Sequence, residues 1–387
     1  MVQVGVICEY NPLHLGHQKQ LQRIRQRFGP DCGIVCLMSG DYVQRGEPAI
    51  FRKMARARAA VVCGADLVLE LPVTCALSSA EGFAGGGVGI LSGLCDTLCF
   101  GTENGDAEGL FSTAEALLSP DFSVRLKETL ATGVSFPAAR QAALEQMGAS
   151  TRLVQSPNDI LAVEYCKAIL LQESPMDIYP IPRQGSYHSL LPDPDNPSAT
   201  ALRRQIETGG SWLPYVPAQA QACFSGEAVH TLRAGERAVL ARLRTMTDAE
   251  FEALPFGSEG LWRKLMHAAR REASLEDIFT DVKSRRYTRT RLNRMVLCAF
   301  LGLTSGMLEA PPPYARILAF NDRGRQILNR AKKTCPLLNA GQPTEHPYWA
   351  MENRCADLYG LFCREGIEAP GTAANDRVLY VHTTEEA

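Results

Sequence analysis

The sequence predicts an α/β protein, with a parallel sheet flanked by helices in the first part of the chain and a mainly helical second part. Short apolar runs alternate with helical patterns over the first hundred residues, and from about residue 227 the pattern is helical and rich in Arg. The length of 387 residues, of which 45% are hydrophobic, suits two domains with buried cores. We therefore expect one domain over residues 1–225 and a second over residues 226–387.

Four apolar runs in the first hundred residues have the length of buried strands, at residues 2–8, 33–38, 67–71 and 97–100. Helical patterns lie between them, at residues 17–28, 52–63 and 79–94. Strands that alternate with helices predict a parallel sheet covered by helices. Ligands of such sheets bind beyond the carboxyl ends of the strands, so a site is expected after Cys8, Met38, Leu71 and Phe100.

Three further elements complete the first part of the chain. A helix is expected over residues 159–171 with Asn158 as its N-cap, and a last strand over residues 176–182. A polar loop then leads to a helix that begins near Ser198. The composition changes after Pro214 and Pro217, and we expect no further strand before the C-terminal tail.

Charge and hydropathy exclude some classes of protein. The chain has 40 Lys and Arg residues against 42 Asp and Glu residues, and this net charge of −2 excludes a uniformly basic protein while leaving room for a basic patch. No apolar run approaches the roughly 20 residues that span a bilayer, and the first residues lack the pattern of a secretion signal. We expect a cytoplasmic protein with no membrane segment.

The 13 cysteines are expected to be reduced and buried. Their number is odd, and Cys8, Cys36 and Cys99 lie inside apolar, strand-like runs. The closest pairs, Cys32 with Cys36 and Cys95 with Cys99, have no His nearby, so neither pair is a good zinc site. We expect no metal ion bound by protein ligands.

A glycine-rich segment at residues 84–93, AGGGVGILSG, is not expected to bind a dinucleotide. The glycine-rich turn of a dinucleotide site follows a strand and opens a helix, whereas this segment precedes the expected strand at residues 97–100. Small residues that allow close helix packing explain it better.

The strongest motif follows the first strand, where residues 9–17, EYNPLHLGH, open a helix. His14 and His17 are three residues apart, so they share one face once the helix has begun. Gly16 has no side chain that would keep a phosphate from the backbone. Free N–H groups at a helix N-terminus, together with two imidazoles, predict a binding site for an anion.

A second phosphate-binding element is expected at the helix near Ser198. Ser198 and Thr200 place two hydroxyls at the helix N-terminus, and Arg203 follows one turn later. A Ser-capped helix that carries an Arg is common without any ligand, so the histidine motif gives this element its significance. The expected catalytic residues are His14, His17, Thr200 and Arg203.

The H-x-G-H motif in a first strand-to-helix turn resembles the signature of the nucleotidyltransferase superfamily. That resemblance implies a Rossmann-like domain that binds ATP and directs attack on its α-phosphate. Further segments, in order along nearly the whole chain, resemble the bacterial tRNA(Met) cytidine acetate ligase family. They lie at residues 38–49, 100–103, 156–158, 183–188 and 285–291.

This family resemblance implies a reaction and a set of site residues. The protein would form acetyl-adenylate from acetate and ATP, with Mg²⁺ held through the phosphates, and pass the acetyl group to N4 of the wobble cytidine of elongator tRNA(Met), giving N4-acetylcytidine. Leu13 stands where the family usually carries Phe, which is a conservative change. The implied ATP site comprises Ile7, Cys8, Glu9, Tyr10, Asn11, Pro12, Leu13, His14, Leu15, Gly16, His17, Gln18, Lys19, Gln20, Gly101, Asn158 and Arg183.

Some residues near the strand ends also have a purely structural interpretation. Asn158 would be explained by helix capping alone. Asp41 and Glu47 are candidate polar groups of the site, but salt bridges with Arg45 or Arg52 would explain them equally well.

A basic run in the second part of the chain is the candidate RNA-binding surface. A solvated helix face normally mixes both signs of charge, so a run of one sign suggests contact with phosphates. Two other groups could extend this surface or simply coat their helices: Arg263, Lys264, Arg270 and Arg271, and also Arg52, Lys53, Arg56 and Arg58. The run itself, which has Tyr287 among its members, comprises Lys283, Arg285, Arg286, Arg289, Arg291 and Arg294.

Three functions are compatible with these motifs. The first is the ATP-dependent acetate ligase acting on tRNA. The second is an adenylyltransferase that transfers AMP to a phosphorylated cofactor precursor, as in NAD or coenzyme A synthesis, although such enzymes are usually much shorter. The third is an RNA-binding protein with a relic nucleotide site, which the intact His14, Gly16 and His17 argue against.

Overall fold

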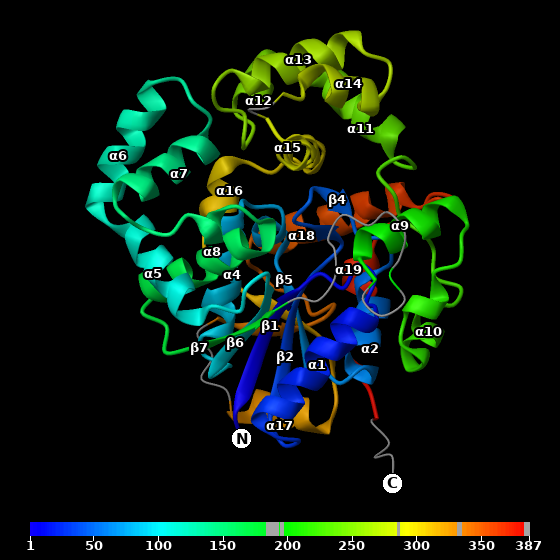
Figure 1. The fold of residues 1–387 in the computed structure, drawn as a ribbon. Coiled ribbons are helices and arrows are strands. Elements are labelled where there is room, and N and C mark those ends of the chain that lie inside the picture. The colour runs from blue at the N-terminus through cyan, green and yellow to red at the C-terminus, as the bar shows by residue number, and fades with distance from the viewer. Residues whose placement is uncertain (183–192, 194–196, 285–286, 331–334, 383–387) are drawn as a thin grey trace.

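The computed structural model describes residues 1–182, 193, 197–284, 287–330 and 335–382. A single large sheet of eight strands runs through the molecule, and helices cover both of its faces (Figure 1). Its strand order is β10-β8-β5-β2-β1-β6-β7, with β9 pairing with β8. The strands are β1 (Gln3–Cys8), β2 (Gly33–Ser39), β5 (Leu67–Leu71), β6 (Thr97–Thr102), β7 (Asp177–Pro182), β8 (Ala315–Phe320), β9 (Leu337–Asn339) and β10 (Leu379–Tyr380).

Five neighbouring strands, β5, β2, β1, β6 and β7, are all parallel. They are the five strands expected from the sequence, and each boundary differs from its expected position by two residues or fewer. Because consecutive strands run the same way, their carboxyl ends meet at one edge of the sheet. The parallel α/β fold expected for the first part of the chain is confirmed.

Alternation along the strands divides the core between the two faces of the sheet. Val35 and Leu37 of β2 pack with helices α4, α5 and α8, whereas Ile34, Cys36 and Met38 pack with α1, α2 and α10. The bounds of these helices are α1 (Leu15–Phe28), α2 (Lys53–Val62), α4 (Ala80–Leu91), α5 (Ala107–Leu118), α8 (Pro157–Leu171) and α10 (Ala218–Phe224).

The glycine-rich segment expected to pack closely does so in α4. A Cβ atom added to Gly87 would lie 2.4 Å from Cδ1 of Ile7 in β1, so this helix lies against the sheet only because it carries glycine there. Between α5 and α8 the chain forms two helices that were not predicted, α6 (Pro120–Ala131) and α7 (Phe136–Gln146).

The second part of the chain returns to the sheet, and the expectation of no strand before the tail was wrong. β8 pairs antiparallel with β5 and extends the sheet by the strands β8, β9 and β10. Its sequence, ARILAF, contains Arg316, whose charge disguises a buried strand. Arg316 is only 3% exposed because Glu352 accepts hydrogen bonds from its guanidinium, the shortest of them 2.8 Å long.

Six helices from the second part of the chain build a core of their own at the carboxyl edge of the sheet (Figure 1). Two residues of the first part, Tyr42 and Leu77, insert into this core. Tyr42 lies in a small hairpin of β3 (Tyr42–Val43) and β4 (Glu47–Pro48) and donates a hydrogen bond to the carbonyl of Cys355, 2.9 Å away. The helices are α11 (Glu236–Thr245), α12 (Asp248–Glu252), α13 (Leu261–Arg271), α14 (Leu275–Val282), α15 (Arg289–Leu301) and α18 (Tyr348–Tyr359).

Two expectations about composition can be compared with this fold. All 13 cysteines lie in the described part of the chain and all are free thiols, 11 of them buried, as expected. Within the described ranges, no helix has both the length and the apolar character needed to cross a membrane.

Candidate functional site

The histidine motif lies where β1 ends and α1 begins, at the carboxyl edge of the sheet. The helix begins at Leu15, two residues earlier than expected, and His14 is its N-cap. Nδ1 of His14 accepts a hydrogen bond from the N–H of Gly16 over 3.1 Å, and Nδ1 of His17 accepts one from the N–H of His14 over 3.3 Å. The two imidazoles thus form a reciprocal capping box in place of the usual hydroxyl and carboxylate.

This capping fixes the orientation and the tautomer of both rings. The rings of His14 and His17 stack with their centroids 3.7 Å apart, and Tyr10 packs against His17 at 4.9 Å. Because Nδ1 of each ring accepts a hydrogen bond, the proton of the neutral imidazole lies on Nε2. Each ring therefore has an N–H donor on the side that faces away from the capped backbone.

The absence of a side chain at Gly16 leaves room for the ring of His14. A Cβ atom at this position would lie 3.1 Å from Cε1 of His14, so a side chain would press against the capping ring. The approach of a phosphate to the backbone at Gly16 stays a prediction, and the structure adds a contact with the neighbouring imidazole.

The second expected phosphate element lies against the first. Ser198 caps α9 (Ala199–Thr208) by accepting a hydrogen bond from the N–H of Ala201. Arg203 donates from Nη1 to the carbonyl of Asn11 over 3.0 Å, and its Nη2 lies 3.4 Å from the hydroxyl of Thr200. The four expected catalytic residues therefore belong to two helix N-termini that meet at the loop after β1.

A buried arginine that sequence reasoning missed holds the loops after β1 and β2. Arg56 of α2 is fully buried and donates to the carbonyls of Phe51, Glu9, Ser39 and Gly40. Burial lowers the pKa of its guanidinium. The sequence suggested an RNA contact or a surface role for Arg56, and both are wrong because four backbone carbonyls enclose it.

Other residues of the motif also support the loop. The side chain of Asn11 accepts a hydrogen bond from the N–H of Ile50 over 2.7 Å, and the carboxylate of Glu9 accepts one from the N–H of Gln44 over 2.9 Å. Nδ2 of Asn11 is buried and has no hydrogen-bond partner among the described residues. Such a donor at the edge of an anion site is available to a ligand.

The other residues implied for ATP lie at the end of the neighbouring strand. Gly101 is in β6, opposite Ile181 of β7. Asn158 donates to the carboxylate of Glu103, just beyond β6, over 2.6 Å. Asn158 is not the N-cap of α8, because Ser156 has that position and accepts from the N–H of Asp159. Arg183 lies outside the described residues.

Asp41 and Glu47 pair with residues other than those expected. Asp41 lies 3.5 Å from Nζ of Lys53, and Glu47 lies 3.9 Å from Nε of Arg203. Glu47 also accepts a weak hydrogen bond from Asn293 of α15 over 3.5 Å. Through these two contacts, the hairpin that carries Glu47 connects α9 with α15.

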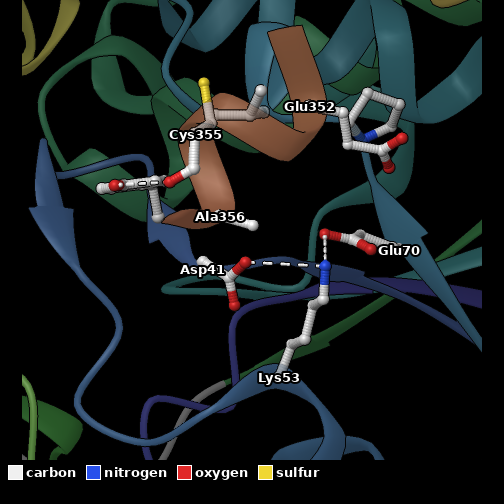
Figure 2. A pocket seen from close by; sticks show the side chains of 9 residues that line it. Asp41, Lys53, Glu70, Glu352, Cys355 and Ala356 are labelled. Atoms are coloured by element: carbon white, nitrogen blue, oxygen red, sulfur yellow. Dashed lines mark hydrogen bonds and ion pairs between the residues drawn. The ribbon is translucent and has the colours of Figure 1, made fainter. Parts of the chain in front are cut away.

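Lys53 is the centre of a buried group of charges beside a small cavity. Figure 2 shows its ammonium between Asp41 and Glu70. Glu352 on α18 lines the same cavity. Burial alone would lower the pKa of Lys53, but the surrounding carboxylates outweigh burial and raise it. Burial raises the pKa of Glu70 to about 7, although Lys53, 3.0 Å away, opposes this rise. Lys53 is thus a structural ion-pair partner and is too buried to contact RNA.

The basic run divides into exposed and engaged members. Arg289 makes a bidentate ion pair with Glu276, at 2.9 and 2.7 Å, and lowers the pKa of that carboxyl. Arg294 donates to the carbonyl of Gln44 and lies over Phe256, and burial lowers its pKa. Lys283 is exposed, whereas Arg285 and Arg286 lie outside the described residues.

Two of the basic groups lie over the ring of Tyr287. Nζ of Lys264 and the guanidinium of Arg291 lie 5.5 and 5.4 Å from its centroid, within the range of cation–π contacts. Of the residues expected to extend the run, Arg270 pairs with Asp248, and Arg271 pairs with Glu272 and Asp281. The basic surface around Tyr287 therefore consists of Arg263, Lys264, Lys283 and Arg291.

The fold and the paired imidazoles define a nucleotidyltransferase of the H-x-G-H type, and comparisons with known proteins agree. The family model described as HIGH Nucleotidyl Transferase matches residues 1–370. Relatives named tRNA(Met) cytidine acetate ligase include one from Acetivibrio thermocellus, 36% identical over 85% of each chain. Another, from Geobacillus sp., is 33% identical over 94% of this chain and 96% of its own. The chain belongs to the tRNA(Met) cytidine acetate ligase family.

Solved structures extend the likeness over the whole fold. The apo structure of Thermotoga maritima TmcAL has a TM-score of 0.91 and 29% identity, and the comparison covers 99% of this chain and 100% of that one. A second structure of the same protein, bound with alpha-thio ATP, has a TM-score of 0.88 with the same identity and coverage.

Proposed function

We propose that this protein is an ATP-dependent acetate ligase that forms acetyl-adenylate and transfers the acetyl group to N4 of the wobble cytidine of elongator tRNA(Met). The observation that carries the proposal is the meeting of two helix N-termini at the loop after β1, joined by the hydrogen bond from Arg203 to the carbonyl of Asn11. The relatives named for this activity, and the relative bound with alpha-thio ATP, support it.

The proposed first step is attack of acetate on the α-phosphorus of ATP, with pyrophosphate as the leaving group. Acetate is already ionised, so the site has to position the reactants and stabilise charge. Nε2 of His14 and of His17 would donate to phosphate oxygens. Arg203 and the hydroxyl of Thr200 would hold the departing phosphates.

Mg²⁺ fits this site as a companion of the nucleotide. The oriented groups around the loop are N–H and O–H donors, which suit phosphate oxygens, and the carboxylate of Glu9 is already engaged by the N–H of Gln44. Mg²⁺ keeps several waters and binds substrate phosphates. When bound, it would neutralise charge on the departing pyrophosphate, held by the phosphates themselves.

The proposed second step brings the tRNA to the same edge of the sheet. The cytidine N4 attacks the carbonyl of acetyl-adenylate, AMP departs, and N4 loses a proton. The basic surface around Tyr287 would bind the tRNA backbone, because Arg263, Lys264 and Lys283 are exposed, and Arg291 is partly exposed although it also donates to Phe256 and Ser258. Arg289 and Arg294 are engaged by Glu276 and by the hairpin, so we expect smaller effects from them.

The decisive experiment is the complete reaction. Purified protein with ATP, Mg²⁺, acetate and unmodified elongator tRNA(Met) should give N4-acetylcytidine, measured by mass spectrometry of the digested nucleosides. Omitting acetate should abolish the product, and so should an initiator tRNA in place of the elongator. Transfer of AMP to a nicotinamide or pantetheine phosphate, without acetylated cytidine, would instead identify a cofactor-type adenylyltransferase.

The tRNA surface is tested separately by binding. Arg291→Ala should weaken tRNA binding and lower the slope of log affinity against log salt by about 1, the change expected for one lost phosphate contact. Arg270→Ala removes an exposed arginine that is paired with Asp248, so it serves as the control and should leave the slope unchanged. Equal slopes for both variants would place the RNA elsewhere.

A further inference from the structure

Three side chains of the kinds that bind metals meet outside the nucleotide site, close to the change of composition near residue 225. His230, Cys363 and Glu368 each offer one ligand atom, and these atoms all lie within 4.8 Å of one another. Imidazole nitrogen, thiolate sulfur and carboxylate oxygen are the donors that zinc prefers. His230 is far in the sequence from Cys363 and Glu368, so no spacing pattern could have indicated the three together.

The backbone holds two of these ligands side by side. His230 and Cys363 face each other in an isolated antiparallel bridge. The flanking N–H groups make its hydrogen bonds, from Thr231 to the carbonyl of Phe362 over 2.9 Å and from Arg364 to the carbonyl of Val229 over 2.8 Å. The facing residues themselves are therefore a non-hydrogen-bonded pair, the kind whose side chains come closest.

The imidazole of His230 is buried without a hydrogen-bond partner. Its side chain is 0% exposed, and neither ring nitrogen is satisfied within the described part of the chain. Nε2 lies 3.2 Å from Oε2 of Glu368, an oxygen that has an ion pair with Arg52 but no hydrogen bond of good geometry among the described residues. The Tyr359 ring, stacked at 4.1 Å, fixes the plane of the imidazole. Buried polar atoms of this kind call for a missing partner.

Arg52 orients the carboxylate of Glu368. Its Nε donates to Oε1 over 3.2 Å, while its Nη2 lies 2.6 Å from Oε2. Binding of a metal through Oε2 would exchange the contact of Nη2 for the ion, while the hydrogen bond from Nε to Oε1 would continue to hold the carboxylate.

We propose that His230, Cys363 and Glu368 bind one divalent transition-metal ion, zinc by preference, through Nε2, Sγ and Oε2. Three protein ligands leave the fourth tetrahedral position to a water molecule. On binding, Sγ loses its proton to solvent and exchanges its contact with Glu365, 3.7 Å away, for the metal. Cys363 is partly exposed, which gives the ion a route in.

A bound ion would link three segments of the chain, which are the turn before α2, the β-bridge at His230 and residues 363–368. The N–H of His230 donates to the carbonyl of Ile50, and Arg52 follows at the start of α2. Arg364, next to the ligand Cys363, donates to the carbonyl of Ile206 in α9. The ion would therefore link the start of α2, the bridge at His230 and the end of the segment that contacts α9.

The test uses the full chain, freed of metal with a chelator and titrated with zinc or cobalt(II). We expect one zinc ion per chain, and a cobalt complex with the thiolate-to-metal absorption band. Cys363→Ser should lose that band and bind zinc at least 10-fold more weakly, whereas Cys223→Ser, a control at another thiol, should behave as wild type. Absence of stoichiometric zinc, or an unchanged band in Cys363→Ser, would overturn the proposal.

A second readout separates binding from folding. Glu368→Gln keeps the size of the side chain and an oxygen for Arg52 but removes the anionic ligand. Zinc should raise the thermal midpoint of the wild-type protein and leave that of Glu368→Gln unchanged. Equal shifts in both proteins would show that zinc binds elsewhere. Neither readout depends on catalytic activity, so both stand apart from the proposed ligase function.

Discussion

His14 and His17 have two tasks at once. Their Nδ1 atoms cap α1, while their Nε2 atoms are the donors that we propose for phosphate. A substitution by Ala therefore removes a helix cap as well as a catalytic group, and loss of activity in such a variant would have two explanations.

His17→Gln separates these tasks, because Gln is a normal capping-box residue at the third helical position. We expect His17→Gln to fold like the wild type and to lose roughly 10²–10³ in the rate of acetyl-adenylate formation, as is typical for removal of one charge-stabilising donor. Pyrophosphate release in the absence of tRNA measures this rate. His17→Ala should in addition lose about 1 kcal/mol of unfolding free energy. A fully active His17→Gln would remove His17 from the proposed mechanism.

The buried carboxyl of Glu70 should make stability depend on pH. Its pKa is about 7 in the folded protein against 4.5 for the ordinary group, so the folded state holds a proton that the unfolded state has released. This contribution to stability is complete below pH 4.5 and is lost as the pH rises through about 7. Urea unfolding across this range should show a declining free energy of unfolding that flattens in Glu70→Gln. An equal slope in both proteins would mean that another group titrates.

At the scale of elements, the sequence predicted the first strands well because each is a short, mainly apolar run that alternates with a helical pattern, even where a charge such as Glu70 lies within it. It predicted the partners of single charges poorly. Lys53 meets Asp376, and Arg52 meets Glu368, across most of the chain length, and no local pattern carries that information. His14 and His17 are only three residues apart, so the sequence did predict that the two side chains lie together.

The β3–β4 hairpin depends on one glycine for its contact with α15. Gly46 has a φ of +74°, and a Cβ atom there would lie 2.3 Å from the backbone nitrogen of Arg294. Gly46→Ala should therefore reduce the free energy of unfolding by about 1–3 kcal/mol through overpacking, beyond the cost of the backbone conformation. Gly133→Ala supplies that conformational cost alone, because its φ is +85° and nothing lies within 4 Å. Urea unfolding should separate the two variants, and equal losses would refute the steric argument.

At the scale of the molecule, the division at residue 225 stays a prediction. Helices α11–α15 share a core, but β8 from the same part of the chain completes the sheet beside β5. The sequence indicated the change of composition correctly. It missed the return to the sheet because Arg316 lies in the apolar run within a helical context, and the partners that make its burial tolerable, Glu352 and the carbonyls of Asn339 and Gln342, lie further along the chain.

This topology predicts that the segment 1–225 will not fold well by itself. Without β8, the strand β5 becomes an exposed apolar edge, which favours aggregation. We expect the fragment to be largely aggregated in size-exclusion chromatography and to lack a cooperative thermal transition, while the full chain is well folded. A monomeric fragment with a sharp transition would instead establish residues 1–225 as an independent domain.

The pairing of β8 with β5 also has a consequence for synthesis. β5 ends at Leu71 and β8 begins at Ala315, so a ribosome that adds about 5–20 residues per second leaves that strand edge unpaired for on the order of tens of seconds. During that time β5 of the nascent chain exposes an unpaired apolar edge, and the sheet that carries the nucleotide site is completed only by the last fifth of the chain.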